Sequence, residues 1–359
     1  MLAKGVAVRW CCAAAHVVVH DNYAGVAHSA ARPGGTAELA AHIDWAGTAR
    51  VRTRLADAGM TIAEAMDTAQ RQSLGWPLAK ELIARTAAQN LQHGFVAGAG
   101  AEQVGDSVQV ARIVDAVVEQ GRWIRAHGGE VALLPLTTLA LAQASEATYC
   151  EVFGAIAREL GAPLILHRLG AVFQPQLRHD FPGDSFQRIL KDHADSIRAV
   201  KWSLLDPEAE VALRRELLPR EQFVLTGDDW NFPALMCGTA QQVGAITGFT
   251  HFGARRVALG DFSHALLGVL DVIAAPLSSA LHCLQTNDAV GWMARMAPLE
   301  ALSRKLFEPP VGDYKAGIAY LSCLNGWQSN PMLLNHQELQ RDAAHYAALR
   351  ALAAAARVT

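Results

Sequence analysis

One lysine stands where a carbonyl-directed nucleophile would be placed. Lys201 lies between Val200 and Trp202 near the end of an apolar run over residues 196–206. Lysine is uncommon in strands and is rarely buried without a specific role. The chain has only 6 Lys among its 31 basic residues, and an amine, unlike a guanidinium, loses its proton when desolvated and can attack a carbonyl. The run therefore indicates a catalytic amine; the alternative is a strand-end lysine that extends its ammonium into solvent.

Other polar residues follow predicted strands in the same way. The candidates at these ends are His20, Asp21, Asp67, Thr68, Gly98, Gly100, Thr137, Thr138, His167, Arg168, Asp228, Asp229, Thr247 and Gly248. In a closed parallel barrel the carboxyl ends of all strands meet at one face, which carries the active site. A barrel would therefore gather these groups around Lys201.

The order of elements predicts such a barrel. Short apolar runs alternate with amphipathic helical segments, and the predicted strands cover residues 13–20, 61–66, 95–100, 130–138, 163–167, 196–201, 223–229 and 243–247. Eight strands at this spacing predict an α/β fold, a (β/α)8 TIM barrel, over residues 1–262. Residues 263–359 have a helical pattern, with breaks expected at Pro276, at 308–312 and at 330–331, and predict a C-terminal helical extension.

Composition limits the class of protein. Hydrophobic residues make up 51% and charged residues 18%, and the net charge is −3, which argues against a nucleic-acid-binding protein. No window is apolar enough for a transmembrane helix, so we expect no membrane association. The six cysteines lack paired spacing and favour reduced thiols in the cytoplasm, and no motif indicates a cofactor or a metal.

Motifs along nearly the whole chain resemble those of the dihydrodipicolinate synthase and N-acetylneuraminate lyase family of Schiff-base aldolases. A-V-K ending at Lys201 resembles the family's G-I-K, T-G-D-D over 226–229 its S-G-D-D, and G-A-I-T-G over 244–248 its G-V-I-S-V. G-A-G over 98–100, L-I-L-H over 164–167, and E-P-P-V at 308–311 with Lys315 and Ala316 resemble further family motifs. Residues 64–70 and 74–76 more closely resemble an uncharacterised branch, known only as a domain of unknown function.

The resemblance implies a carbon–carbon or carbon–oxygen lyase that forms a Schiff base between Lys201 and a 2-oxo acid or keto-sugar substrate, without a cofactor. His167 falls where the family has its proton-relaying tyrosine, and Thr137 near the supporting tyrosine, so these two are the expected catalytic partners. The expected substrate-binding residues are Asp67, Thr68, Gly98, Arg168, Asp228, Thr247 and Gly248. Of the family's G-T-T-G-E loop only Thr68 matches, which puts its carboxylate pocket in doubt. A homo-oligomer, dimer or tetramer, is also expected.

Imidazole titrates near neutrality, so His167 can move a proton as a phenol does, and a pH-rate limb near neutrality is expected. Alternatively, His167 is a buried structural histidine and the acidic pair at 228–229 caps a helix. Two other functional classes stay open. A metal-dependent barrel lyase would gather ligands from His16, His20, Asp21, His167, Asp228 and His251, although their spacing matches no metal motif. A non-catalytic barrel that binds a sugar acid would use Lys201 only as a hydrogen-bond donor.

Overall fold

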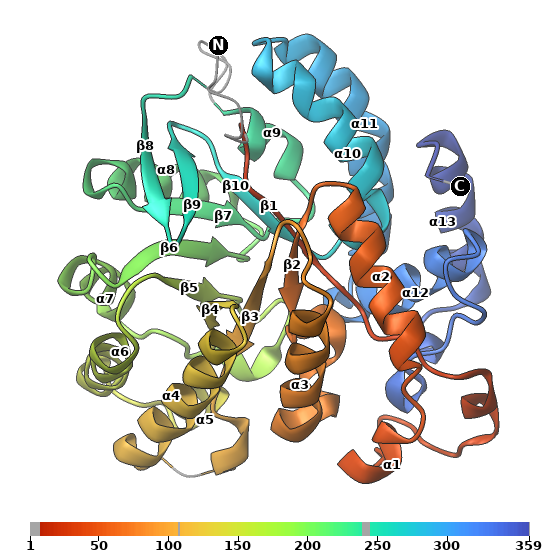
Figure 1. Ribbon diagram of the computed structural model, residues 1–359, viewed down its shortest axis with the longest axis horizontal. Coiled ribbons are helices and arrows are strands. Elements are labelled where there is room, and N and C mark those ends of the chain that lie inside the picture. The colour runs from red at the N-terminus through yellow and green to blue at the C-terminus, as the bar shows by residue number, and fades with distance from the viewer. Residues whose placement is uncertain (1–7, 107, 239–244, 359) are drawn as a thin grey trace.

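Eight parallel strands close into a barrel, which confirms the predicted (β/α)8 fold (Figure 1). The computed structural model describes residues 8–106, 108–238 and 245–358. Around the ring the order is β1, β10, β7, β6, β5, β4, β3, β2. The strands are β1 (Cys11–Ala14), β2 (Thr61–Glu64), β3 (Phe95–Ala99), β4 (Glu130–Leu133), β5 (Leu164–Arg168), β6 (Ile197–Trp202), β7 (Phe223–Thr226) and β10 (His264–Leu267).

Two predicted strands are misplaced. The first strand is β1, which ends before the β-branched run that suggested residues 13–20. The prediction of the eighth strand over 243–247 is wrong: residues 243 and 244 lie outside the described ranges, and 245–247 lead into an antiparallel hairpin of β8 (Gly248–Phe252) and β9 (Arg255–Leu259). The eighth barrel strand is β10, which lies just past the expected barrel boundary at residue 262. The division of the chain into two domains stays a prediction.

The hairpin covers the amino-terminal end of the barrel. Phe252 packs against Trp10 and Phe223, with ring centroids 5.2 Å and 6.0 Å apart. Arg255 donates to the carbonyl of His93, just before β3, at 2.8 Å. Aromatic side chains therefore fill this end, and a ligand that reaches the inside of the barrel has to enter from the carboxyl end.

Strand alternation fixes the direction of Lys201. Neighbouring residues of a strand face opposite sides of the sheet. Ala199 belongs to the small interior cluster of the barrel, whereas Val200 and Trp202 pack into the core between strands and helices, and Trp202 contacts Phe186. Lys201, two residues after Ala199, therefore points into the barrel at the carboxyl end of β6.

Helices surround the barrel between the strands. They are α1 (Thr36–Ala40), α2 (Trp45–Asp57), α3 (Arg71–Ala88), α4 (Val110–Ala126), α5 (Thr137–Leu141), α6 (Glu146–Leu160), α7 (Ser185–Asp192), α8 (Pro207–Leu217) and α9 (Phe232–Cys237). Local sequence explains several ends. Asp44 caps α2 by accepting from the amide of Gly47 at 2.8 Å. Gly75, at φ 61°, kinks α3, so Pro77 lies in the first turn after the kink.

The C-terminal segment is helical and packs on the barrel. Its helices are α10 (Leu270–Gln285), α11 (Ala289–Leu306), α12 (Tyr314–Leu324) and α13 (Ala343–Ala355), which gather on one side of the barrel in Figure 1. The break expected at Pro276 is wrong, because Pro276 lies inside α10. The buried residues Val272, Ile273 and Leu277 hold this helix against the core, and the loss of one backbone hydrogen bond does not end it.

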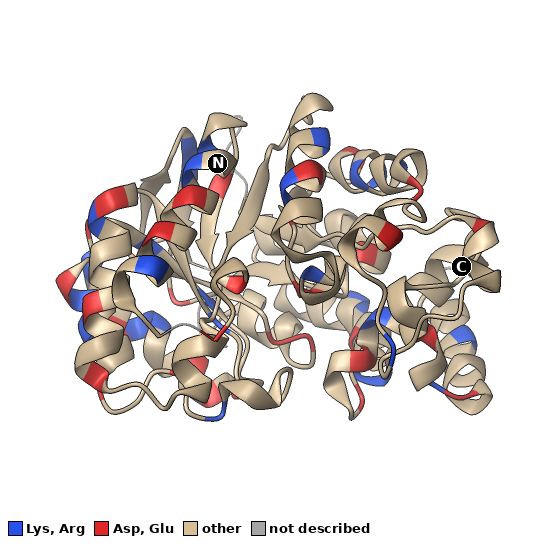
Figure 2. Cartoon of the chain, turned by 90° about the horizontal axis from the view of Figure 1, so that it is seen from below, with Lys and Arg blue, Asp and Glu red and all other residues tan. Residues whose placement is uncertain are grey.

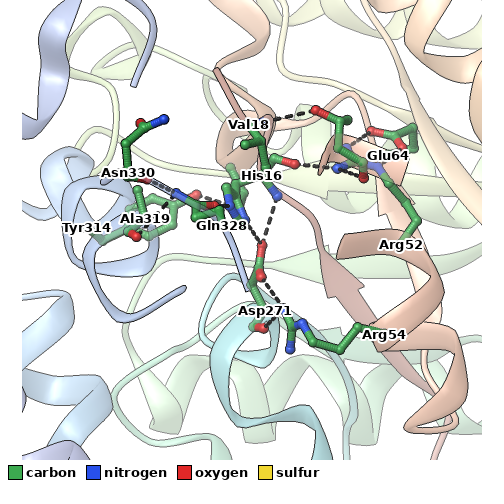
Figure 3. A network of polar contacts seen from close by, with 12 residues as sticks. His16, Val18, Arg52, Arg54, Glu64, Asp271, Tyr314, Ala319, Gln328 and Asn330 are labelled. Atoms are coloured by element: carbon green, nitrogen blue, oxygen red, sulfur yellow. Dashed lines mark hydrogen bonds and ion pairs between the residues drawn. The ribbon is translucent and has the colours of Figure 1, made fainter. Parts of the chain in front are cut away.

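A buried polar network joins this segment to β1 (Figure 3). His16 bonds Asp271 through Nδ1 at 2.7 Å and Gln328 through Nε2 at 2.6 Å, and Arg54 donates to Asp271 at 2.9 Å. His16 and Asp271 are fully buried. The network therefore fixes α10 and the loop after α12 relative to the barrel strands.

Charge is dispersed over the molecule. Basic and acidic residues are interspersed along the ribbon in Figure 2, in keeping with the small net charge. Among the described residues, no helix combines the length and the apolar character that a membrane crossing requires.

We predict that Glu64→Ala destabilises the fold by about 3–5 kcal/mol. Glu64 forms a two-pronged ion pair with Arg52 at 2.8 Å and 2.9 Å, both side chains are fully buried, and Thr86 donates to the same carboxylate. Urea denaturation would measure the loss. Glu81→Ala, which removes an exposed pair with Arg85, should cost less than about 0.5 kcal/mol, and equal costs would contradict the assignment.

Candidate active site

Lys201 is a buried amine at the carboxyl end of the barrel. Its side chain is 8% exposed, and it lies in register with His167 of β5 and Leu225 of β7. Within the described ranges no side chain forms a hydrogen bond or ion pair with its ammonium. Burial lowers the pKa of Lys201 from the usual value, and the carboxylates of Asp229 and Asp67 partly offset this effect. This direction agrees with the sequence-based expectation of an amine that loses its proton when desolvated.

Asp229 is the carboxylate that acts most on this lysine. It is 3% exposed, and its Oδ1 accepts from the amide of Val269, just after β10, at 2.8 Å. Burial raises the pKa of Asp229, and the charge of Lys201 opposes the rise. The sequence places Asp229 at the end of the seventh barrel strand in chain order, where the structure has it. As the substrate-binding residue of this turn, however, the sequence favoured the neighbouring Asp228.

Asp228 has a local structural role. Its carboxylate accepts from the amides of Trp230 and Asn231 at 2.9 Å and 3.0 Å, and from the side chain of Asn231 at 2.8 Å. These bonds shape the turn before α9. The helix-cap alternative is wrong, because Asn231 is the N-cap residue of α9 and, within the described residues, no side chain caps the helix.

His167 is the imidazole next to Lys201. It is 2% exposed, its Nε2 lies 3.4 Å from the hydroxyl of Ser203, and its Nδ1 is buried without a hydrogen-bond partner in the described structure. Burial, together with the charge of Lys201, lowers the pKa of His167 well below the usual value. The ring is therefore neutral at pH 7, and the limb expected near neutrality moves to acid pH.

The loop after β2 is tied to the start of α12. Asp67 accepts from the ammonium of Lys315 at 3.0 Å and 3.1 Å, and Thr68 shares a 2.7 Å hydrogen bond with the hydroxyl of Tyr314. Tyr314 and Lys315 are not among the site residues predicted from the sequence. Lys315 was recognised only as part of a motif, and no periodicity marks Tyr314, because their partners are some 246 to 248 residues away.

A cavity of about 290 Å³ opens at this end of the barrel. Its lining is formed by Asp67, Arg71, Gln72, Gly100, Ala101, Glu102, Leu134, Pro135, Leu136, Thr137, Thr138, Leu141, His167, Leu169, Gln174 and Gln176. Thr137 thus lies at the cavity, although it begins α5 and does not end a strand. The lining includes His167, the neighbour of Lys201, and Asp67, the neighbour of Thr68.

Four other predicted residues are not among those that line this cavity. Gly98 is part of β3, and its carbonyl accepts from Arg71 at 2.8 Å. Arg168 points to the outer side of β5, where its guanidinium lies 4.8 Å from the ring centroid of Phe181. Thr247 and Gly248 belong to the hairpin at the opposite end, so the structure does not bring them to Lys201.

The six potential metal ligands do not converge either. His16 is bound to Asp271, His251 lies in the hairpin, and Asp228 caps the turn before α9. Within the described ranges, no group of three or more His, Cys, Asp or Glu side chains is arranged to hold a metal ion.

Fold and site together define a (β/α)8 barrel with a buried lysine on the inner side of its sixth strand in chain order. The chain belongs to the family described as "Protein of unknown function (DUF993)", which matches residues 2–359. A search of curated proteins finds no match.

Solved structures similar to this chain include dihydrodipicolinate synthases and an N-acetylneuraminate lyase. Dihydrodipicolinate synthase from Aquifex aeolicus aligns with a TM-score of 0.67 at 15% identity, over 98% of each chain. The enzyme from Oceanobacillus iheyensis gives 0.63 at 16% identity, also over 98% of each chain. N-acetylneuraminate lyase from Fusobacterium nucleatum, complexed with pyruvate, gives 0.64 at 10% identity over 97% of this chain and 96% of its own. The resemblance inferred from the motifs is thus confirmed at the level of the fold.

We predict that in Asp229→Asn the pH profile of the reactivity of the Lys201 amine moves to lower pH by roughly one unit or more. The carboxylate raises the pKa of Lys201, so its loss lowers that pKa and leaves more free amine at a given pH. The rate of covalent labelling of Lys201 against pH measures the shift. Asp206→Asn, the same change at the cap of α8, should leave the profile in place.

We predict that His167→Phe keeps borohydride trapping at Lys201 but lowers turnover by roughly two to four orders of magnitude, the usual contribution of one acid–base group. The pKa of His167 is lowered, so the wild-type pH-rate profile should have a limb on the acid side of neutrality, and the variant should lack it. Steady-state rates against pH would show this. His282→Phe, at an exposed position of α10, should behave as wild type. Unchanged turnover in His167→Phe would show that His167 is a structural residue and takes no part in catalysis.

Proposed function

We propose that this protein is a lyase that forms a Schiff base between Lys201 and the carbonyl group of a small-molecule substrate. The observation that carries the proposal is the state of Lys201, a buried amine on the inner face of the barrel with no paired carboxylate within the described residues. An amine with a lowered pKa is partly unprotonated near neutrality and can attack a carbonyl carbon. The superfamily of the structural neighbours supports the same class of chemistry.

The residues around the cavity suggest distinct roles. His167, a neutral imidazole at its wall, exchanges a proton with a substrate hydroxyl. Thr137 and Asp67, which line the cavity, contact polar groups of the substrate. Thr68, the next residue after Asp67, shares its hydroxyl hydrogen bond with Tyr314.

Of the two substrate types expected from the sequence, the cavity favours a keto sugar over a 2-oxo acid. Arg71 is bound to Glu102, with atoms 2.6 Å apart, and Lys315 is bound to Asp67, so neither is available to pair with a substrate carboxylate. The wall instead offers amides and hydroxyls that suit substrate hydroxyl groups: Gln72, Gln174, Gln176, Thr137 and Thr138. The carboxylate-binding loop of the resembled family is also largely absent.

We predict that borohydride reduction in the presence of the right carbonyl compound adds its mass to Lys201, located by peptide mass spectrometry. Trapping with a panel of 2-oxo acids and keto sugars should favour the sugars, because they match the uncharged polar wall. Lys201→Ala should abolish both adduct and turnover while leaving the fold intact. Lys191→Ala, which removes an exposed lysine of α7, should change neither.

A fully active Lys201→Ala protein would exclude the mechanism. Binding of a sugar acid without any adduct would instead support the non-catalytic alternative. The cytoplasmic location and the homo-oligomer, dimer or tetramer, stay predictions.

A further inference from the structure

Tyr314 reaches the mouth of the barrel from the C-terminal segment. It is the first residue of α12, 3% exposed, and its ring stacks on Phe307 with centroids 4.3 Å apart at 14°. Gly268, directly after β10, makes room for this ring: a Cβ at Gly268 would lie 2.8 Å from the Cε2 of Tyr314. The phenol is therefore held firmly above the end of β10.

In the ring of strands, β1 lies between β10 and β2. The hydroxyl of Tyr314 reaches from the β10 side of β1 to its β2 side. It shares a 2.7 Å hydrogen bond with Thr68, which follows β2 and is 2% exposed. The pair is thus a phenol and an alcohol in contact, at the carboxyl end of the barrel, next to the cavity residue Asp67. Two hydroxyl groups in contact can pass a proton, because each can donate and accept at once.

The same carboxylates act on Lys201 and on this phenol. Burial raises the pKa of Tyr314 well above the usual value, with further contributions from Asp67 and Asp229, while the bond to Thr68 opposes the rise. Asp229 and Asp67 are also the carboxylates that act on Lys201. Lys201 and Tyr314 therefore belong to one electrostatic environment, in which the phenol keeps its proton at neutral pH.

We propose that Tyr314, through the hydroxyl of Thr68, supplies the proton that the substrate's carbonyl oxygen needs when Lys201 forms its Schiff base. The proposal rests on the function proposed above and adds a residue that lies outside the barrel strands. His167 is the less suitable source for this step, since its buried neutral ring faces Ser203 and has little tendency to carry an extra proton.

The proton balance assigns one role to each group. The Lys201 nitrogen bonds to the carbonyl carbon, the π pair moves to oxygen, and oxygen takes a proton from Thr68, which takes one from Tyr314. The adduct nitrogen then returns its extra proton to Tyr314, leaving a neutral carbinolamine. A second transfer along the same path lets the hydroxyl leave as water while the nitrogen lone pair forms the C=N bond. The second transfer leaves Tyr314 as a phenolate that balances the positive charge of the iminium, and hydrolysis of the iminium returns the proton to Tyr314.

Rates of borohydride trapping with a compound that labels wild-type Lys201 test the relay. Tyr314→Phe keeps the ring and its stacking on Phe307 but removes the hydroxyl. We expect the first-order trapping rate to fall by roughly two to four orders of magnitude, with little change in the substrate concentration at half-saturation. His167→Phe, by contrast, should keep trapping. Tyr320→Phe is the matched control, because Tyr320 lies on the same helix and packs against Tyr346.

Substitutions at Thr68 give an independent test that keeps Tyr314 in place. Thr68→Ser retains the hydroxyl and should trap within a fewfold of wild type, whereas Thr68→Val should show the loss seen in Tyr314→Phe. A trapping rate in Tyr314→Phe or Thr68→Val equal to that of wild type would overturn the relay and leave the Schiff-base function standing. A wild-type protein that no carbonyl compound labels would instead refute the Schiff-base function itself.

Discussion

The burial of one amine at the carboxyl end of the barrel is the constraint on which the site depends. An ammonium group removed from water is disfavoured, so a buried lysine either finds a carboxylate partner or gives up its proton more readily. Lys201 has no carboxylate in ion-pair contact within the described residues, but Asp229 and Asp67 act on it from a greater distance. This arrangement lowers the pKa of the amine without neutralising it in a salt bridge, which is the balance that a nucleophilic lysine requires.

The C-terminal segment makes this environment possible. Asp67 is held by Lys315, and Thr68 by Tyr314, both at the start of α12. Gln328, in the loop after α12, donates to the carbonyl of Ala319 in α12 and contacts His16, whose other ring nitrogen bonds Asp271 of α10 (Figure 3). A chain of short polar contacts thus runs from the extension to the loop after β2. The extension therefore supports the loop that carries Asp67 and Thr68, in addition to covering the barrel.

The two ends of the barrel have opposite characters. At the amino end the hairpin of β8 and β9 packs Phe252 on Trp10 and Phe223, so aromatic side chains close this end. At the carboxyl end a cavity lies beside His167 and Asp67. Small side chains at Ala132 and Ala199 fill the middle of the barrel, so Lys201 stands on a tightly packed floor. Rigid support of this kind fixes the amine relative to its neighbours.

The sequence by itself predicted the barrel and the strand-end position of Lys201, because the order of elements is a property that a chain displays directly. The inward direction of Lys201 was decided by the structure, in which Ala199 lies inside the barrel and Val200 and Trp202 lie outside it. The sequence also placed His167 and Asp67 at strand ends that do meet. It could not identify the last strand, since the four residues of β10 carry a weaker signal than the segment at 243–247, and pairing partners decide which run joins the ring. Nor could the sequence choose Asp229 over Asp228, because the choice depends on which of the two carboxylates is engaged by hydrogen bonds within the turn. Tyr314 and Lys315 became site residues only in the folded protein, because their partners at Thr68 and Asp67 lie far away in sequence and only tertiary packing brings them into contact.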